Sequence, residues 1–463
     1  MRKVNIQTAK KSPRHETKNK LIKNLLKEHL FTSLGQSIFK IFSTPHIILK
    51  VFLTIFILVS TGFASYLVIQ SIMTYLSFGV VTTSRTIFET PTLFPKVTFC
   101  NINWITTEYG FRQRQKGSNN LSNEEKRKLG HDLNDILFEC KFNDNPCKAS
   151  DFTWSYDVKY GNCFTFNSGV DSSEKKVGLK KSNLAGPNFG LRLTLYVNIY
   201  EELLESRSSL GAIIRIGNSS YLTDNSNSGI LISPGEQTFI AVEREFQSML
   251  SKPHSNCEID SDSSFTSDSY LFNLIAHSNF DYSQQFCFTQ CLQNKFIKKY
   301  NCTLYYFISL YNRSQCSPDV EALIFTSADS FDSKFISETC LPLCPLECNQ
   351  TLYKTLISSN KLNAKSFYLS SIRENKNLTA DFINRSIDAN IARESIIYVN
   401  IFYERLSYTL TTESPQMDIV SLLSSIGGNL GLFLEVSLFT LCEFVQVVIE
   451  MYFALKIKRQ VTS

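Results

Sequence analysis

Three carboxylates lie inside a long apolar stretch near the C-terminus, which runs from Met417 to Leu455. No charged residue occurs in 419–434, and the acids Glu435, Glu443 and Glu450 follow. An ionisable group is costly in lipid, so such residues usually face a helix bundle interior or a water-filled path. The stretch is longer than the about 20 residues that one bilayer span requires, so it must tilt, break or project beyond the membrane. We interpret it as a membrane helix that lines a path for ions.

The polar and small residues of this stretch share one stripe. At about 100° per residue they occupy roughly 100° of the helix circumference, and Leu, Ile, Val and Phe cover most of the rest. The stripe contains Ser421, Ser424, Ser425, Gly428, Glu435, Glu443, Gln446 and Glu450. A simple anchor whose acids pair with another subunit is the alternative, although an anchor needs no such stripe. Gly427, Gly428 and Gly431 could also break the helix and change these angles.

A second apolar stretch, uncharged from Val51 to Ser84, predicts another membrane helix over residues 49–75. Lys and Arg gather outside both stretches: residues 1–50 hold eleven against two Glu, and 456–463 add three more. A basic tail can indicate nucleic-acid binding. Here both clusters flank apolar spans, as cytoplasmic flanks do. We therefore expect both termini in the cytoplasm and no nucleic-acid partner.

The cysteines and glycosylation sequons share one region. Of thirteen cysteines, twelve lie from Cys100 to Cys348, while Cys442 lies in the last apolar stretch. An even set confined to one region predicts six disulfides in an oxidising compartment. Seven Asn-x-Ser/Thr sequons occur, none at either end of the chain: Asn120, Asn218, Asn301, Asn312, Asn349, Asn377 and Asn384. The central region is therefore predicted to be extracellular.

Local patterns predict several elements of this region. Alternating apolar residues indicate strands at 191–200 and 211–217, and residues 131–140 are typical of a helix. Cys287 and Cys291 are four residues apart, on one face of a helix predicted over 287–299. This pair could bind zinc with the cysteines of 340–348, but disulfides are favoured in a glycosylated domain.

Motifs of the common enzyme classes are missing from the sequence. It contains no HExxH, GxSxG, Walker or dinucleotide-binding motif, and its six histidines are scattered. We predict that the protein is not an enzyme, requires no cofactor and has no metal site.

Six motifs, in order along nearly the whole chain, resemble the family of degenerins, epithelial sodium channels and acid-sensing ion channels. The motifs are LFPKVTFCN (93–101), CKFNDNPCKASDFTWSYDVKYGNCFTFNSG (140–169), SPGEQTFIAVERE (233–245), CPLECNQTLY (344–353), FYERLSYT (402–409) and SLLSSIGGNLGLFLEVS (421–437). The first is similar to the family's FPxVTxCN signature, and the last to its pore mouth.

The resemblance implies a homo- or heterotrimer of related subunits that conducts sodium ions across the lipid bilayer. It implies an ectodomain of palm, β-ball, knuckle, finger and thumb. By position it also implies six disulfides: Cys100–Cys163, Cys140–Cys147, Cys257–Cys348, Cys287–Cys344, Cys291–Cys340 and Cys302–Cys316. A further thumb disulfide of the family has no counterpart, because Tyr300 stands at one of its positions.

The resemblance also assigns roles within the last stretch. Ser424 and Ser425 fall at the gate, where bulky side chains hold degenerin channels open. Glu435, Val436 and Ser437 fall at the selectivity motif, preceded in the pore by Gly428 and Gly431. The lower pore contains Glu443, Gln446 and Glu450.

Three departures from the family pattern bear on function. The N-terminal His-Gly gating motif is not recognisable near Gly35 and Gln36. Val80 stands where acid-sensing members carry a histidine. Glu435 replaces the first glycine of the Gly-x-Ser selectivity motif. These positions bear on open probability, proton gating and ion selectivity, respectively.

Together these features predict an α+β membrane protein with two transmembrane helices flanking a large disulfide-rich extracellular domain. The segments are a cytoplasmic tail and pre-membrane segment (1–48), the first span (49–75), the extracellular domain (76–417), the pore-lining second span (418–455) and a short cytoplasmic tail (456–463).

The predicted function is a subunit of a trimeric, amiloride-sensitive, sodium-permeable channel of the plasma membrane, opened by an extracellular stimulus such as a ligand. One alternative is a modulatory subunit that conducts only beside a partner, which the missing His-Gly motif favours. The other is a non-conducting cell-surface receptor. An ATP-gated receptor channel also has two spans, but none of the six motifs belongs to that class.

Overall fold

The computed structural model describes residues 45–116, 121–157, 159–171, 175–197, 209–218, 229–259, 268–278, 280, 282–304, 307–326, 333–363, 365–366, 393–434, 445 and 449. The chain forms two compact units. Residues 1–81 and 415–463 belong to the first unit, and residues 82–414 form the second. The first unit contains the two apolar helices α3 (Ile47–Leu76) and α16 (Ile419–Leu434).

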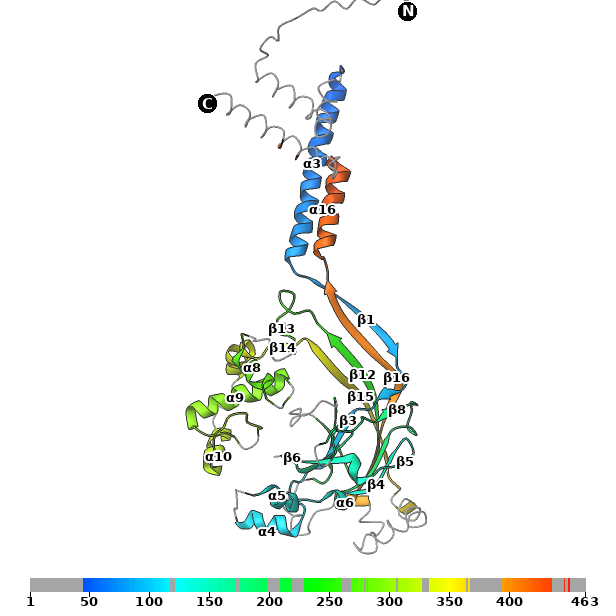
Figure 1. The fold of residues 1–463 in the computed structure, drawn as a ribbon, viewed down its shortest axis with the longest axis vertical. Coiled ribbons are helices and arrows are strands. Elements are labelled where there is room, and N and C mark those ends of the chain that lie inside the picture. Colours follow the sequence, from blue (N-terminus) through cyan, green and yellow to red (C-terminus); the bar gives the residue numbers. More distant parts are fainter. Residues whose placement is uncertain are drawn as a thin grey trace, which may run out of the picture. The chain divides into compact units, whose positions relative to one another are not determined.

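In the described part of the second unit, more residues lie in strands than in helices (Figure 1). They are β1 (Val80–Phe88), β2 (Thr92–Leu93), β3 (Lys96–Asn101), β4 (Leu137–Phe142), β5 (Asn145–Pro146), β6 (Phe152–Asp157), β7 (Gly161–Phe166), β8 (Lys181–Ser182), β9 (Leu191–Tyr196), β10 (Ala212–Gly217), β11 (Ile230–Ile232), β12 (Glu236–Ser248), β13 (Cys257–Glu258), β14 (Leu346–Glu347), β15 (Asn349–Lys361) and β16 (Ile396–Pro415).

Helices interrupt these strands in two regions. The first region contains α4 (Glu108–Lys116), α5 (Asn123–Leu129), α6 (Leu133–Ile136) and the 3-10 helix η1 (Ala149–Asp151). The second contains α8 (Tyr270–Ala276), α9 (Gln284–Tyr300), α10 (Pro318–Thr326), α11 (Ser333–Phe335), the π-helix η2 (Ile336–Cys340) and α12 (Leu341–Leu343).

Two sheets carry the core. The larger has the strand order β15-β12-β16-β9-β4-β5, with β1 also paired to β16, and the other has the order β11-β10-β3-β7-β6. Strands β12 and β15 are antiparallel, whereas β12 and β16 are parallel with a register shift between Val242 and Arg244. Two smaller sheets pair β13 with β14 and β2 with β8.

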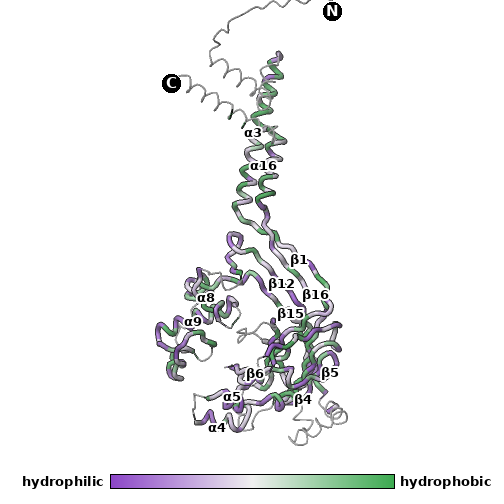
Figure 2. Tube along the Cα trace, viewed as in Figure 1, coloured by the Kyte–Doolittle hydropathy of each residue, from purple (hydrophilic) through white to green (hydrophobic). Residues whose placement is uncertain are grey.

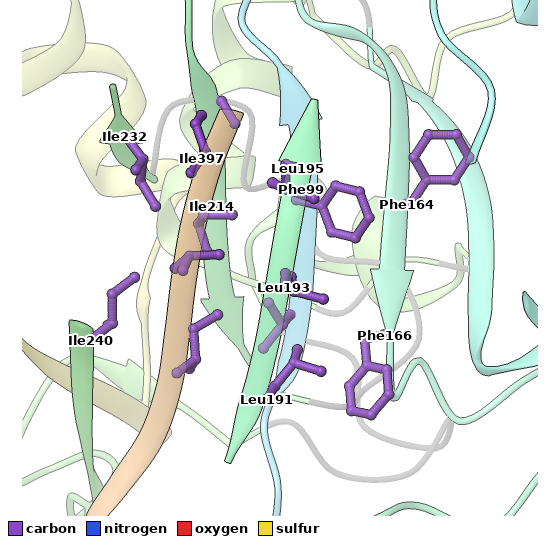
Figure 3. Packing of buried hydrophobic residues seen from close by; sticks show 14 of the residues in the cluster. Phe99, Phe164, Phe166, Leu191, Leu193, Leu195, Ile214, Ile232, Ile240 and Ile397 are labelled. Atoms are coloured by element: carbon purple, nitrogen blue, oxygen red, sulfur yellow. The ribbon is translucent and has the colours of Figure 1, made fainter. Parts of the chain in front are cut away.

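The core lies between these two sheets (Figure 3). Phe99, Phe164 and Phe166 extend from β3 and β7 of the five-stranded sheet. Strand β9 of the larger sheet contributes Leu191 and Leu193. All five are at most 1% exposed. Burial of apolar side chains of this size is the main favourable term in folding, so this cluster stabilises the second unit.

Two asparagines of the family-like motifs have structural roles in this unit. Asn167 has a left-handed backbone (φ 59°), donates to the carbonyl of Phe94 and accepts from the amide of Lys180. Buried Asn101 accepts from the amide of Asn103 and donates to the carbonyl of Val197. These side chains satisfy backbone groups where strands end, which is why polar residues occur at buried positions.

Six disulfides cross-link the second unit. They join Cys100 to Cys163, Cys140 to Cys147, Cys257 to Cys348, Cys287 to Cys344, Cys291 to Cys340 and Cys302 to Cys316. These are the pairs that the resemblance implies. Cys287 and Cys291 project from one face of α9, so two bonds tie this helix to the segment around Cys340. Tyr300 packs in the apolar cluster at the end of α9, formed around Phe296.

Most of the predicted elements are confirmed where the structure describes them. Strand β9 covers 191–196 of the strand predicted over 191–200, of which residues 198–200 lie outside the described part. Strand β10 covers 212–217, and α9 includes the whole of 287–299. The helix predicted over 131–140 is wrong beyond Ile136. Asp132 and Asp135 form a capping box that starts α6, but from Leu137 the chain pairs with β9 as strand β4. Pairing with an available strand, together with the Cys140–Cys147 bond, outweighs the helical pattern.

Two completely buried glutamines of α9 bond the backbone of the segment that follows this helix. Gln293 accepts from the amide of Leu304 and donates to the carbonyls of Leu304 and Phe307. Gln290 accepts from the amide of Leu310 and donates to the carbonyl of Ile308. These amide groups satisfy the extended chain that follows α9, so they connect the helix to that segment without a sheet.

We expect Gln293→Leu to destabilise the protein, because the backbone groups of Leu304 and Phe307 would stay buried without this partner. The loss should be about 2–3 kcal/mol, visible as a lower unfolding temperature of the detergent-solubilised chain. Gln285→Leu is the matched control, since Gln285 is exposed on the same helix. Equal unfolding temperatures for the two variants would contradict this role.

Candidate functional site

Helix α3 satisfies its own polar groups. The hydroxyls of Thr54, Thr61, Ser65 and Thr74 each donate to the carbonyl four residues earlier, at 2.8–2.9 Å. In lipid no water is available to satisfy such groups, so internal bonding suits a membrane helix. In the described part of the chain, α3 is the one helix long and apolar enough to cross a membrane. It includes the whole of residues 49–75.

Helix α16 begins at a defined cap and is described as far as Leu434. The Asp418 carboxylate accepts from the amide of Ser421 at 2.7 Å, which satisfies a free amide of the first turn. The helix is mainly apolar over its 16 residues (Figure 2). This length is below the about 20 residues of a full span. Residues 435–444 lie outside the described part, so a complete second span is not shown.

One face of α16 packs against α3. The Ser71 and Ser425 hydroxyl oxygens are 3.0 Å apart. Since Ser71 donates its proton to the Leu67 carbonyl, Ser425 is the donor between the helices. On the α3 side Ala64 is 0% exposed and Ser71 8%, and on the α16 side Leu422 is 8%. Small residues at such a crossing let two membrane helices approach closely.

A second contact lies further along the same pair of helices. The Ser60 hydroxyl donates to the Phe433 carbonyl at 2.9 Å. The rings of Phe63 and Phe433 meet edge to face, with centroids 5.2 Å apart. Phe433 is therefore held by α3 at both its backbone and its side chain.

The opposite face of α16 is open and lined by small residues. Its exposed members include Ser421, Ser424, Gly427, Gly428 and Gly431. A Cβ built at Gly427 or Gly428 would meet no atom within 4 Å. Bulky Leu423 and Leu432 are exposed beside this strip. The strip offers hydroxyls and bare backbone to whatever covers this face.

The structure therefore separates the two serines predicted at the gate. Ser424 lies on the open face, whereas Ser425 is bonded to Ser71 on the α3 side. Gly428 and Gly431, predicted in the pore, lie on the open face with Ser424. The remaining predicted pore residues lie outside the described part: Glu435, Val436, Ser437, Glu443, Gln446 and Glu450.

Sequence reasoning missed the α3 side of this site. Ser60 and Ser71 are eleven residues apart, about three helical turns, so they share one face of α3 with Ala64. Small or hydroxyl residues at this spacing in an apolar helix are the signal that could have identified the interface.

The larger sheet of the second unit contains a buried arginine side chain. The Arg244 side chain is 5% exposed and pairs with Glu89, which follows β1. Its guanidinium lies 4.9 Å from the Phe246 ring centroid and 5.1 Å from that of Tyr408. A buried charge is stable only when it is paired, so this arrangement ties the end of β1 to strand β12.

The Glu245 carboxylate lies next to Arg244 on strand β12. Lys354 of β15 and then Gln247 donate to the Glu245 carboxylate, which holds its pKa below the usual range. The ionised form is the stabilised one. Its contribution to stability is therefore present at neutral pH and is lost as the pH falls through this lowered pKa.

The described sequons are accessible. Asn218, Asn301, Asn312 and Asn349 are all exposed, as a bulky glycan requires, whereas Asn120, Asn377 and Asn384 lie outside the described part. In the described residues no group of three or more His, Cys, Asp or Glu could hold a metal ion. The cysteines considered as zinc ligands form disulfides instead.

Comparison with known proteins gives one family. The sequence profile of the amiloride-sensitive sodium channel matches residues 36–120 and 105–447. Epithelial sodium channel subunit beta-2 of Xenopus laevis is 28% identical over 329 residues, covering 70% of this chain and 48% of that protein. Subunit gamma of Neoceratodus forsteri is 27% identical over 332 residues, covering 71% and 48%. The chain thus spans about half the length of these relatives.

Among solved structures, a proton-activated chloride channel can be aligned with this chain. The alignment covers 87% of this chain and 98% of the chloride channel chain. The TM-score is 0.33 and the identity is 8%, a likeness too low to support a conclusion.

The two faces of α16 should differ in their access to water. We expect Ser424→Cys to react readily with a membrane-impermeant thiol reagent, and Ser425→Cys to react at least about tenfold more slowly, because a thiolate forms only where water reaches it. Intact cells are first treated with the reagent, and a maleimide then labels the cysteines that have not reacted. The loss of maleimide labelling with time measures both rates. Equal rates, or no reaction at Ser424→Cys, would contradict a water-filled path along the open face.

Proposed function

This chain belongs to the amiloride-sensitive sodium channel family, and from that premise we propose that it is a subunit of a trimeric, amiloride-sensitive, sodium-permeable cation channel. Its place is the plasma membrane, and its opening responds to an extracellular stimulus. The observation that carries the proposal is the match of the family profile from residue 36 to residue 447, which includes both apolar helices and the region between them.

The two faces of α16 support a pore role for this helix. One face is occupied by α3, through Leu422 and the Ser71–Ser425 contact. The other face presents Ser424 and Gly428, with open space above the glycine. In a trimer three such strips would face one axis, where hydroxyls and bare backbone can take the place of water around a passing ion.

The proposed topology has two spans and cytoplasmic termini. Helix α3 forms the first span, and residues 418–455 form the second. Six disulfides and four exposed sequons support an extracellular place for residues 76–417, because both modifications belong to the secretory pathway.

Glu435 gives the proposed pore a property of its own. If three copies surround one axis, three carboxylates face each other, and like charges at short range resist simultaneous ionisation. A partly ionised ring still attracts cations. Carboxylate oxygens are more mobile than backbone carbonyls, so this pore discriminates less between sodium and potassium than one with the family's glycine at this position. Calcium, which prefers several carboxylate oxygens, enters or blocks.

A modulatory subunit that conducts only beside related subunits is the second candidate. The relatives that resemble this chain are themselves named as beta and gamma subunits, and no His-Gly motif is recognisable near Gly35. A non-conducting receptor is less well supported, since a simple anchor needs no Glu435 within its apolar stretch.

Voltage clamp of oocytes tests the proposal directly. The chain is expressed alone and with beta and gamma subunits of epithelial sodium channels, and currents are recorded with and without amiloride under proton, peptide and stretch stimuli. An amiloride-blocked current from the chain alone supports a complete channel. A current that appears or changes only in co-expression supports the modulatory subunit. No effect in either setting, with the chain at the cell surface, would favour the receptor.

Glu435→Gly should restore the glycine of the family motif. We expect the sodium-to-potassium permeability ratio to rise and calcium block to weaken, because the carboxylate ring is removed. Reversal potentials in sodium, potassium and calcium solutions measure both effects. Glu404→Gln, an exposed carboxylate of β16, is the control and should leave them unchanged. Identical ratios, calcium block and pH dependence in Glu435→Gly and wild type would show that this carboxylate does not face the ions.

A further inference from the structure

We propose that Ser60 is a positioning residue for ion discrimination. Its hydroxyl holds the backbone of α16 at Phe433, two residues before the triplet Glu435-Val436-Ser437. This inference rests on the proposed function, because it concerns the geometry of that pore.

The contact fixes one peptide group from two directions. Ser60 Oγ lies 2.9 Å from the carbonyl oxygen of Phe433. One helical turn away on α3, Phe63 packs edge to face on the Phe433 ring. The adjacent Ala64 is 0% exposed, so the backbones approach closely at this level. A carbonyl held by a hydrogen bond and a ring held by packing leave little freedom to rotate or tilt.

This bond is not the usual one for a serine in an apolar helix. Such a hydroxyl ordinarily donates to the carbonyl four residues earlier on its own helix, as Thr61 and Ser65 do. Ser71 also donates within α3, to Leu67, and meets Ser425 only as an acceptor. In the described part of α3, Ser60 is the one hydroxyl that donates to the backbone of α16.

The bonded carbonyl stands at a sensitive place. Phe433 precedes Glu435, the first residue of the triplet, by two positions in the chain. The Ser60 bond therefore fixes the orientation of a peptide group just before the triplet. Ion discrimination depends on where a few oxygen atoms are held, so an anchor at this point affects it.

The test compares three α3 variants by their sodium-to-potassium permeability ratios. Ser60→Ala removes the hydroxyl, Ser60→Thr keeps one, and Ser65→Ala removes an exposed hydroxyl that bonds only within α3. We expect Ser60→Ala to change the ratio about threefold, the size that an average hydrogen bond between membrane helices supports. Ser60→Thr should restore the wild-type ratio, and Ser65→Ala should retain it. A merely structural role would change surface expression without this pattern.

The contact itself is tested without any current. In the full-length chain, Ser60→Cys combined with Phe433→Cys should form a disulfide on mild oxidation, detected by mass spectrometry of digested peptides. Ser65→Cys combined with Phe433→Cys should not.

The outcomes separate the inference from the proposed function. A conducting wild type whose ratio is the same in Ser60→Ala overturns the inference alone, as does failure of the Ser60→Cys, Phe433→Cys pair to link. A wild type that carries no current, alone or with beta and gamma subunits, overturns the proposed function and any role in ion discrimination with it, even where the disulfide forms.

Discussion

Two membrane helices cannot be held together by the hydrophobic effect, because lipid is as apolar as their side chains. Close packing and hydrogen bonds must do it instead. In this chain Ala64 provides the close approach, and Ser60 and Ser71 provide the hydrogen-bonding contacts. This interface decides which face of α16 is covered and which is open. The proposed pore depends on that choice, since Ser424 and Gly428 are free only because Leu422 and Ser425 face α3.

Much of the fold could be predicted from sequence because its signals are local or covalent. Alternation identified β9 and β10, and the four-residue spacing of Cys287 and Cys291 identified α9. The helix predicted over 131–140 failed from Leu137, because strand β9 offers a partner that no local pattern shows. The polar stripe of α16 was predicted as one set, but the packing of α3 divides it: Ser425 turns inward and Ser424 does not. A periodicity calculated on one helix contains no information about its neighbour.

Two residues of the family-like motifs account for the fold rather than for the proposed function. Asn101 and Asn167, which the motifs share with the family, satisfy buried backbone groups between strands. They account for the fold rather than for ion passage. In the proposed pore, Glu435 is the residue that departs most from the family pattern. A common ectodomain can therefore carry pores with different selectivity, because fold and site depend on separate residues.

The proposed channel requires a water-filled cation path along the open face of α16. Sodium uptake into liposomes that contain the purified, disulfide-complete protein tests it most directly, with the protein alone and together with beta and gamma subunits of epithelial sodium channels. We predict an uptake that this chain produces or increases and that amiloride abolishes. Liposomes in which the folded chain adds no amiloride-sensitive sodium uptake in either setting would contradict the account.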